Sequence, residues 1–184
     1  MKKFSKIVLV AAKFMEILHW FATIIMLVVF IVSILASGWL STILETGIPE
    51  LGNQLTTYGF EIVAANTDNS IIMPAINLFS IGAVIILFLM AMVFRNIYLI
   101  IKKVFSKGET PFQKDITRMV RETGIFLIAV PIIGVIVSAL GNVCGIHSEI
   151  SVDLQGIITG SIILVLSEVF IYGSKLQKDV DGLL

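Results

Sequence analysis

Four long runs of apolar residues divide the sequence, over residues 17–37, 71–94, 124–140 and 154–173. A helix rises about 1.5 Å per residue, so roughly 17 to 25 residues cross a hydrocarbon core about 30 Å thick. All four runs reach that length, whereas shorter runs would indicate buried helices of a soluble protein. The pattern therefore predicts an all-α membrane protein, a bundle of four transmembrane helices that forms a single membrane domain over residues 1–184.

The composition agrees with a bilayer as the surrounding solvent. Hydrophobic residues make up 57% of the chain and charged residues 14%, with a mean hydropathy of +1.01, whereas a soluble domain typically carries about 25% charged residues. Such a chain cannot cover its apolar surface with polar groups. Its net charge of zero favours no particular partner. The single cysteine, Cys144, excludes an intrachain disulfide and a cysteine-based metal cluster.

The basic residues indicate the direction of the spans. All 13 lie before the first run, between the second and third, or after the fourth, and the loops 40–70 and 141–153 contain none. Cytoplasmic loops carry an excess of lysine and arginine. We therefore expect a multi-pass membrane protein with both termini and the connection 95–123 in the cytoplasm. The residues are Lys2, Lys3, Lys6, Lys13, Arg95, Lys102, Lys103, Lys107, Lys114, Arg118, Arg121, Lys175 and Lys178.

Two segments of the outer loops have the pattern of strands. Residues 55–63 are rich in β-branched and aromatic residues, and residues 149–154 alternate between polar and apolar. Strands are not stable alone in water. We therefore expect the two segments to pair as a small extracytoplasmic β cap over the outer ends of the helices; the alternative is two irregular loops.

The flanks of the spans are predicted to be helical as well. Residues 1–16 have a broad apolar side and are expected to extend the first helix along the interface. Before the third span, Thr110 suits an N-cap and Pro111 the first helical position. Apolar residues then recur at helical spacing, which predicts an amphipathic helix that runs into the third span. They are Phe112, Ile116, Met119 and Val120.

Small residues mark places of close helix packing. Gly156 and Gly160 form a GxxxG pair at the start of the fourth span, and Gly134 and Ser138 form a similar pair in the third. Small residues at this spacing let helix backbones approach within a membrane. The sequence leaves two interpretations of these pairs open: they pack helices within one bundle, or they form the face of a dimer. Pro131 is expected to kink the third span.

Glu168 lies within the fourth apolar run, in its inner half. A charged side chain at the bilayer centre costs on the order of 3 kcal/mol or more. Arg95 closes the second span and Arg121 opens the third, both near the same leaflet. One interpretation is an ion pair or a hydrogen-bonded carboxyl that pins the fourth helix to its neighbours. The other is a site that handles protons or cations.

The sequence contains no recognisable catalytic set and no phosphate-binding loop. Glu16 and His19 stand one turn apart, but di-metal bundles need further glutamates and histidines from other helices. The other histidine, His147, lies in an outer loop. We therefore predict no catalytic, cofactor or metal site. Contact with lipid explains the basic segments, so we expect no direct binding of nucleic acid.

Two stretches resemble a known family. Residues 108–112 read GETPF and lead into the basic helix 118–121, and residues 166–181 read LSEVFIYGSKLQKDVD. Together they resemble the bacterial membrane family known as domain of unknown function 2975. The resemblance implies four helices and, because members are often encoded beside a small Cro-type helix-turn-helix regulator, a role in regulation. Ile171 and Lys178 depart from the family pattern, in which we expect a basic and an acidic residue.

The sequence favours a non-enzymatic membrane protein that acts through a partner, as a sensor, immunity-type protein or regulator. The connection 102–122 and the tail 175–184 would contact a cytoplasmic protein, such as a small helix-turn-helix regulator, or a membrane subunit. The alternative is a small transporter or channel subunit that uses Glu168. The candidates for the partner surface are Lys114, Arg118, Lys175 and Lys178.

Overall fold

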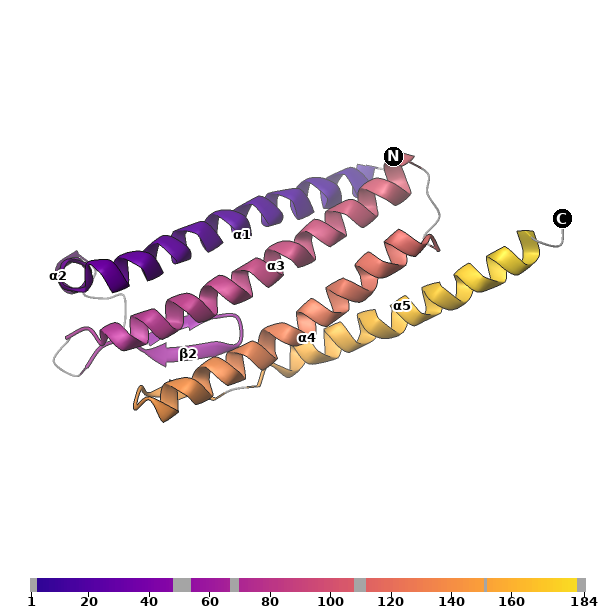
Figure 1. Cartoon of the computed structure of the whole chain (residues 1–184). Helices are drawn as coiled ribbons and strands as arrows, with labels where there is room; N and C mark the ends of the chain where they lie inside the picture. Colours follow the sequence, from indigo (N-terminus) through magenta and orange to yellow (C-terminus); the bar gives the residue numbers. More distant parts are fainter. Residues whose placement is uncertain (1–2, 48–53, 67–69, 108–111, 151, 182–184) are drawn as a thin grey trace. The chain divides into compact units, whose positions relative to one another are not determined.

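The structure is a computed structural model that describes residues 3–47, 54–66, 70–107, 112–150 and 152–181 (Figure 1). These residues form five helices and three short strands. In order they are α1 (Lys3–Leu35), α2 (Ser37–Gly47), β1 (Gln54–Thr57), β2 (Phe60–Val63), α3 (Met73–Lys107), α4 (Lys114–Val143), β3 (Ser148–Glu149) and α5 (Leu154–Asp181).

Four of these helices are long and apolar enough to cross a membrane, which confirms the four-helix prediction at this level. The qualifying stretches are Lys6–Leu35, Met73–Phe105, Lys114–Val143 and Leu154–Gln177. Within the chain, only 17% of the most apolar window of α1 and 11% of that of α5 is buried. Large apolar side chains therefore cover the outer faces of these two helices, as expected for surfaces that contact lipid.

The helices extend beyond the apolar runs of the sequence. Helix α1 includes the predicted amphipathic flank from Lys3, and α4 begins at Lys114, ahead of the third apolar run. In α4, Ile116 and Met119 are buried while Asp115 and Arg118 are exposed, so the predicted amphipathic helix is confirmed. The predicted N-cap at Thr110 lies outside the described residues.

Helix α2 was not predicted, because residues 40–70 were interpreted as a loop. Leu40 of α2 is buried and packs with Ala64 and Ile76, and half-buried residues of α1 and β1 surround this cluster. The signal in the sequence is the helical spacing of Leu40 and Leu44 after Ser37, on an element too short to cross a bilayer.

The chain divides into two compact units. The first comprises Met1–His19, Leu89–Ala129 and Leu154–Leu184, and the second comprises Trp20–Phe88 and Val130–Asp153. Helices α1, α3 and α4 contribute residues to both units, and the single membrane domain stays a prediction.

Polar and aromatic contacts join the helices of the first unit. The rings of His19 in α1 and Phe94 in α3 have their centroids 5.0 Å apart. Between α3 and α4, Lys103 Nζ lies 3.1 Å from a carboxylate oxygen of Asp115. These contacts position the beginning of α4, which carries most of the basic residues of the candidate site.

A three-stranded antiparallel sheet forms in the second unit, in the order β1-β2-β3. Strands β1 and β2 are a hairpin in which Thr57 is opposite Phe60, and Gly59 in its turn has φ 88°, a value that side chains rarely allow. Strand β3 pairs with β2, with Ser148 opposite Ile62. The predicted pairing of the two segments is thus confirmed between Glu61 and Glu149. Residues 55–63, however, form two strands, and the second segment contributes only Glu149, because β3 ends there and α5 begins at Leu154.

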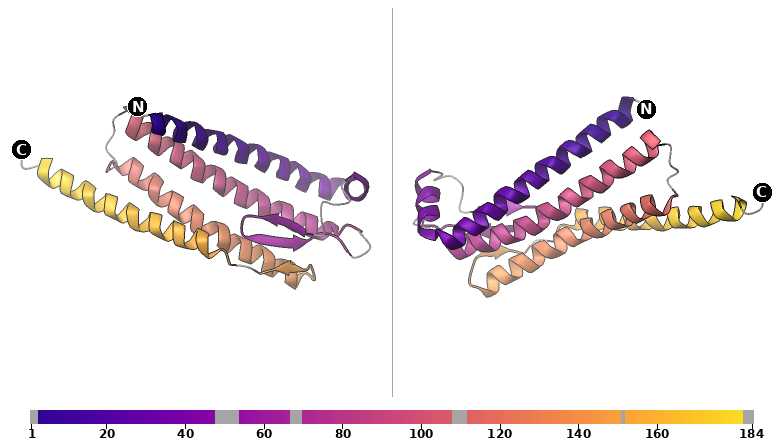
Figure 2. Two further views of the ribbon diagram at one scale, coloured as in Figure 1. Left: turned by 180° about the vertical axis from the view of Figure 1, so that it is seen from behind. Right: turned by 45° about the horizontal axis from the view of Figure 1, so that its top comes forward.

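The hairpin lies along the helices of its unit, beside α3 in Figure 1 and in the left view of Figure 2. Phe60 is 1% exposed, and a Cβ on Gly82 of α3 would lie 2.8 Å from its ring. A Cβ on Gly59 would lie 3.5 Å from Cα of Pro131, near the middle of α4. A cap over the helix ends is therefore wrong, because the apolar side chains of β2 are buried among the helices instead.

Candidate functional site

The site begins with close packing of α4 against α5. A Cβ on Gly160 would lie 2.8 Å from the carbonyl oxygen of Gly124 and 2.7 Å from Cγ1 of Ile128. The two backbones therefore touch where glycines face each other, as small residues in apolar helices allow. Of the predicted GxxxG pair, Gly160 makes this contact and Gly156 is half-buried.

A second contact joins the beginning of α4 to α5. A Cβ on Gly173 would lie 2.6 Å from Cε1 of Phe112. Phe112 also meets Phe170 edge to face, with ring centroids 6.0 Å apart. Phe112 thus packs against α5 two residues before Lys114 begins the helix, and this holds the basic first turns of α4 beside α5.

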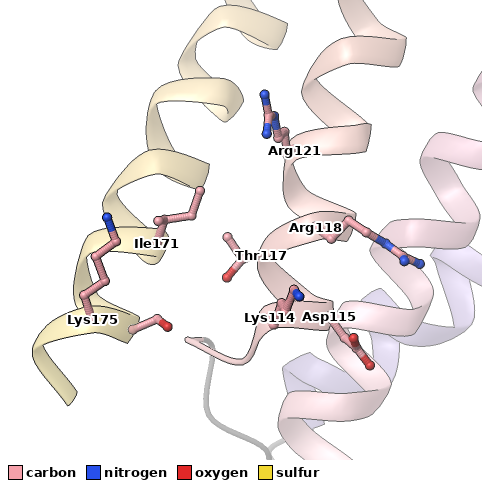
Figure 3. Close-up of a pocket in the computed structure, with 8 residues that line it drawn as sticks. Lys114, Asp115, Thr117, Arg118, Arg121, Ile171 and Lys175 are labelled. Atoms are coloured by element: carbon pink, nitrogen blue, oxygen red, sulfur yellow. The ribbon is translucent and has the colours of Figure 1, made fainter. Parts of the chain in front are cut away.

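Between these helices lies a groove of about 420 Å³, which we call the basic groove (Figure 3). Figure 3 shows Thr117 and Ile171 facing each other across it, with Arg121 beyond them on α4 and Lys175 on α5. The guanidinium of Arg118 points away from α5 in this view. The lining residues are Lys114, Asp115, Thr117, Arg118 and Arg121 of α4 and Ile171, Ser174 and Lys175 of α5.

The cations of the groove are only partly neutralised. Asp115 is the one acidic residue among the described residues that line the groove, and it pairs with Lys103 outside it. Arg118 Nε lies 3.3 Å from a carboxylate oxygen of Glu122. Lys114, Arg121 and Lys175 form no ion pair within the described part of the chain. Three positive charges without an ion-pair partner among the described residues thus line the same groove as Ile171, an arrangement whose chemistry suits an anionic group beside an apolar one.

Three of the four predicted partner-surface residues line this groove: Lys114, Arg118 and Lys175. The side chain of Lys178 lies outside the described residues. Arg121, predicted as a partner of Glu168, is a lining residue instead. The sequence did not identify Thr117, Ile171 and Ser174, because their inclusion depends on how α4 and α5 meet.

Glu168, Arg95 and Arg121 are not brought together as an ion-paired group. Glu168 is exposed on α5 and forms no ion pair with any described residue. Arg95 is exposed on α3, where its Nη1 lies 4.0 Å from Sδ of Met92. The carboxylate of Glu168 therefore faces the surroundings of the chain rather than another of its helices.

Glu16 and His19 are both buried but have local partners. Lys13 Nζ donates to Glu16 at 3.0 Å, and Nδ1 of His19 lies 2.8 Å from the carbonyl oxygen of Met15. Across the described residues, no group of three histidines, cysteines, aspartates or glutamates could hold a metal ion.

The other small-residue pair contacts the sheet. Gly134 of α4 lies against the backbone of Gly59 in the hairpin turn. Ser138 is buried, and its carbonyl oxygen accepts a hydrogen bond of 2.6 Å from Oγ of Ser148 in β3. These small residues therefore make room for strands and a turn, rather than for a second helix.

Comparison of the chain with protein-family models, curated proteins and solved structures finds no match. The resemblance to domain of unknown function 2975 therefore depends on the two stretches of sequence alone.

Proposed function

We propose that the chain is a non-enzymatic protein of a bacterial plasma membrane that acts through a partner, as a regulatory, sensor or immunity-type module. Four helices long and apolar enough to cross a bilayer support the membrane location. The distribution of the 13 basic residues along the sequence supports cytoplasmic termini. In this orientation the basic groove opens to the cytoplasm.

The partner is a cytoplasmic protein that places a short acidic segment in the basic groove. The observation that carries this proposal is that Lys114, Arg121 and Lys175, none of them in an ion pair with a described residue, line one groove together with Ile171. Carboxylates form charge-assisted hydrogen bonds with lysine and arginine. Ile171 offers an apolar contact beside them. A small helix-turn-helix regulator, which the family resemblance implies, is one protein that could supply the segment.

Anionic lipid is the competing ligand for these cations. Each lysine or arginine near a membrane surface attracts anionic headgroups by about 1 kcal/mol. A bound protein segment is recovered in fixed proportion to the chain in mild detergent, whereas headgroups exchange with the surrounding lipid. The proportion of a co-purifying protein therefore separates the two ligands.

The test is purification of the tagged full chain from native membranes in mild detergent, with quantitative mass spectrometry of the proteins that accompany it. Lys114→Glu, Arg121→Glu and Lys175→Glu each place a negative charge in the groove. Because a hydrogen bond to a charged group contributes about 1.5 to 3 kcal/mol, we expect each variant to lower recovery of the partner about tenfold or more.

Lys6→Glu is the matched control, because Lys6 is exposed and lies outside the groove but is expected on the same side of the membrane. It makes the same change of net charge and should leave recovery unchanged. Equal recovery with all four variants, or no protein in fixed proportion to the wild type, would contradict the proposal.

A transport role for Glu168 is the second candidate, because its exposed carboxylate forms no ion pair with a described residue. A chain of this size would need further copies to enclose a pathway, and Glu168 would then face the neighbouring copy. Glu168→Gln should abolish a proton- or cation-coupled flux in liposomes that contain the purified protein. Flux that persists in this variant, or no flux with the wild type, excludes the role.

A further inference from the structure

Within the part of the chain that the structure describes, β1 is an edge strand, and only its side facing β2 is paired. In an antiparallel hairpin, hydrogen-bonded and non-hydrogen-bonded pairs alternate, and the pair that closes a two-residue turn is hydrogen-bonded. Here that pair is Thr57 and Phe60. The N–H and C=O groups of Thr56, and likewise those of Gln54, therefore point away from β2.

Two observations support this assignment. Val63, opposite Gln54, donates its N–H to the carbonyl oxygen of His147 at 2.9 Å, on the side of β2 away from β1. In the described part of the chain, the outward groups of Gln54 and Thr56 have no hydrogen-bond partner. The edge of β1 thus offers two donors and two acceptors in the spacing of a strand.

A groove of about 490 Å³ runs beside this edge, and we call it the edge groove. Helices α1 and α3 form its other walls, and none of the described residues that line it is charged. The lining residues are Ala22, Ile25 and Met26 of α1, residues 54–57 of β1, and Phe79, Ala83 and Leu87 of α3.

Contacts between α1 and α3 lie on both sides of the groove along these helices. On one side, Ser33 donates a hydrogen bond to the side-chain oxygen of Asn77. On the other, the rings of Trp20 and Phe88 meet edge to face with centroids 5.6 Å apart. The groove thus lies within the apolar stretches Lys6–Leu35 and Met73–Phe105.

At this depth an open sheet edge needs a partner. Backbone N–H and C=O groups that lack hydrogen bonds are costly in hydrocarbon, and open edges are found there only when protein or a water-filled cavity covers them. An acyl chain fills apolar space but supplies neither a donor nor an acceptor. The edge groove combines apolar walls with unpaired backbone groups, which is the surface that an extended peptide complements.

We propose that the edge groove binds an extended, uncharged segment of a partner polypeptide, which adds a strand along β1. The partial charges of the edge are complementary to those of a strand backbone, and the walls accommodate apolar side chains on one face of that strand. The inference depends on the proposed function only in taking the helices to cross a bilayer. It requires neither the basic groove nor the acidic segment.

The first experiment maps what lies in the groove. A photo-reactive phenylalanine analogue replaces Met26 or Thr56 in the full chain, and native membranes are irradiated. Ile24 is the control position, because it is close to Met26 in α1 but exposed and outside the groove. We expect both groove probes, but not the probe at Ile24, to attach to the same uncharged polypeptide segment. A probe at Gln54 should attach two residues further along that segment than the probe at Thr56.

The second experiment removes one donor from the edge. Thr56→Pro deletes the outward N–H without removing a hydrogen bond between β1 and β2, and proline is tolerated on edge strands. Thr56→Ala deletes the hydroxyl but keeps this N–H. We expect the proline variant to lower attachment at Met26 about tenfold and the alanine variant to leave it unchanged. Gln54→Pro, at the first residue of the strand, should behave as Thr56→Pro does.

Several outcomes would overturn the inference. They are attachment of lipid alone, attachment of a second copy of this chain, absence of any polypeptide adduct, and equal attachment in the proline and alanine variants. Resistance of the chain to carbonate extraction is measured on the same membranes. Loss of integration would therefore be recognised as failure of the membrane location, and unchanged binding at the basic groove would leave the proposed function intact.

Discussion

Gly59 in the hairpin turn and Gly134 in α4 are in direct backbone contact. A Cβ on Gly134 would lie 2.7 Å from the carbonyl carbon of Gly59 and would overlap its oxygen. The turn is therefore seated on the helix surface at a place where only a hydrogen atom fits. Because the turn also contacts Pro131, this pair of glycines sets how deeply the hairpin lies along α4.

Substitution of Gly134 should destabilise the protein. In Gly134→Ala the new methyl group meets backbone rather than a flexible side chain, so the turn or the helix must shift, at a cost of about 1 to 3 kcal/mol. Thermal unfolding in detergent measures the loss. Gly38→Ala in α2 is the control, because no atom lies within 4 Å of a Cβ there, and it should leave the melting temperature unchanged or slightly raised.

The buried ring of Phe60 should contribute strongly to stability. It packs on Phe79, with ring centroids 5.4 Å apart, and against Gly82. Phe60→Ala should lower the free energy of unfolding by about 3 to 5 kcal/mol, as is typical of buried phenylalanines. Phe14→Ala removes a ring that is exposed in the chain. Equal effects of the two substitutions in the same unfolding assay would contradict the position of the hairpin.

Gly160 should be intolerant of any side chain. Its Cβ would meet the carbonyl oxygen of Gly124, so Gly160→Ala should separate α4 from α5 and cost about 1 to 3 kcal/mol. Ser161→Ala is the matched control on the next residue, which is exposed and bonds only within its own helix, to Ile157. In detergent, the free energy of unfolding of Gly160→Ala should be clearly lower than that of Ser161→Ala. If the two variants unfold alike, the helix contact is not as described.

Binding at the basic groove should weaken with salt. The Debye length falls from about 10 Å at 0.1 M to about 3 Å at 1 M ionic strength. Recovery of the partner with the wild type and with Lys6→Glu should therefore fall together as salt is raised. Recovery of the partner with Lys175→Glu should be low already at low salt and should change little as salt is raised. Recovery of the partner that is indifferent to salt would indicate that binding does not depend on the groove cations.

The orientation of the helices can be tested through Cys144. It is the single cysteine of the chain and is exposed just after α4. A membrane-impermeant maleimide should label it in intact cells from which any outer membrane has been removed. Leu176→Cys in a Cys144→Ser background places an exposed thiol on α5 and should be labelled only after permeabilisation. The reverse pattern would show that the termini lie outside.

Hydrophobic periodicity predicted the four long helices because the signal is local. Each apolar run is long enough by itself to cross a bilayer as one helix. The amphipathic beginning of α4 was recognisable for the same reason, from the spacing of Ile116 and Met119. Helix α2 was missed because it is short and because its apolar side is completed by Ala64 and Ile76, which come from other elements.

The candidate site was partly recognisable. Lys114, Arg118 and Lys175 were predicted from charge alone, but charge did not indicate that Arg118 pairs with Glu122 and that Arg121 lines the groove. Those facts depend on the rotation of α4 about its axis. The same rotation is set by contacts at Gly124 and Phe112 with α5.

By itself, the sequence determined the number of long apolar helices, the strands within residues 55–63 and the grouping of the basic residues. Each of these features depends on residues that are close together in the sequence. Only the tertiary structure placed the hairpin among the helices, left Glu168 exposed and opened a groove beside β1. These features depend on which surfaces meet between segments far apart in the chain, as when Gly59 meets Gly134, and close packing at such points tolerates no added atom.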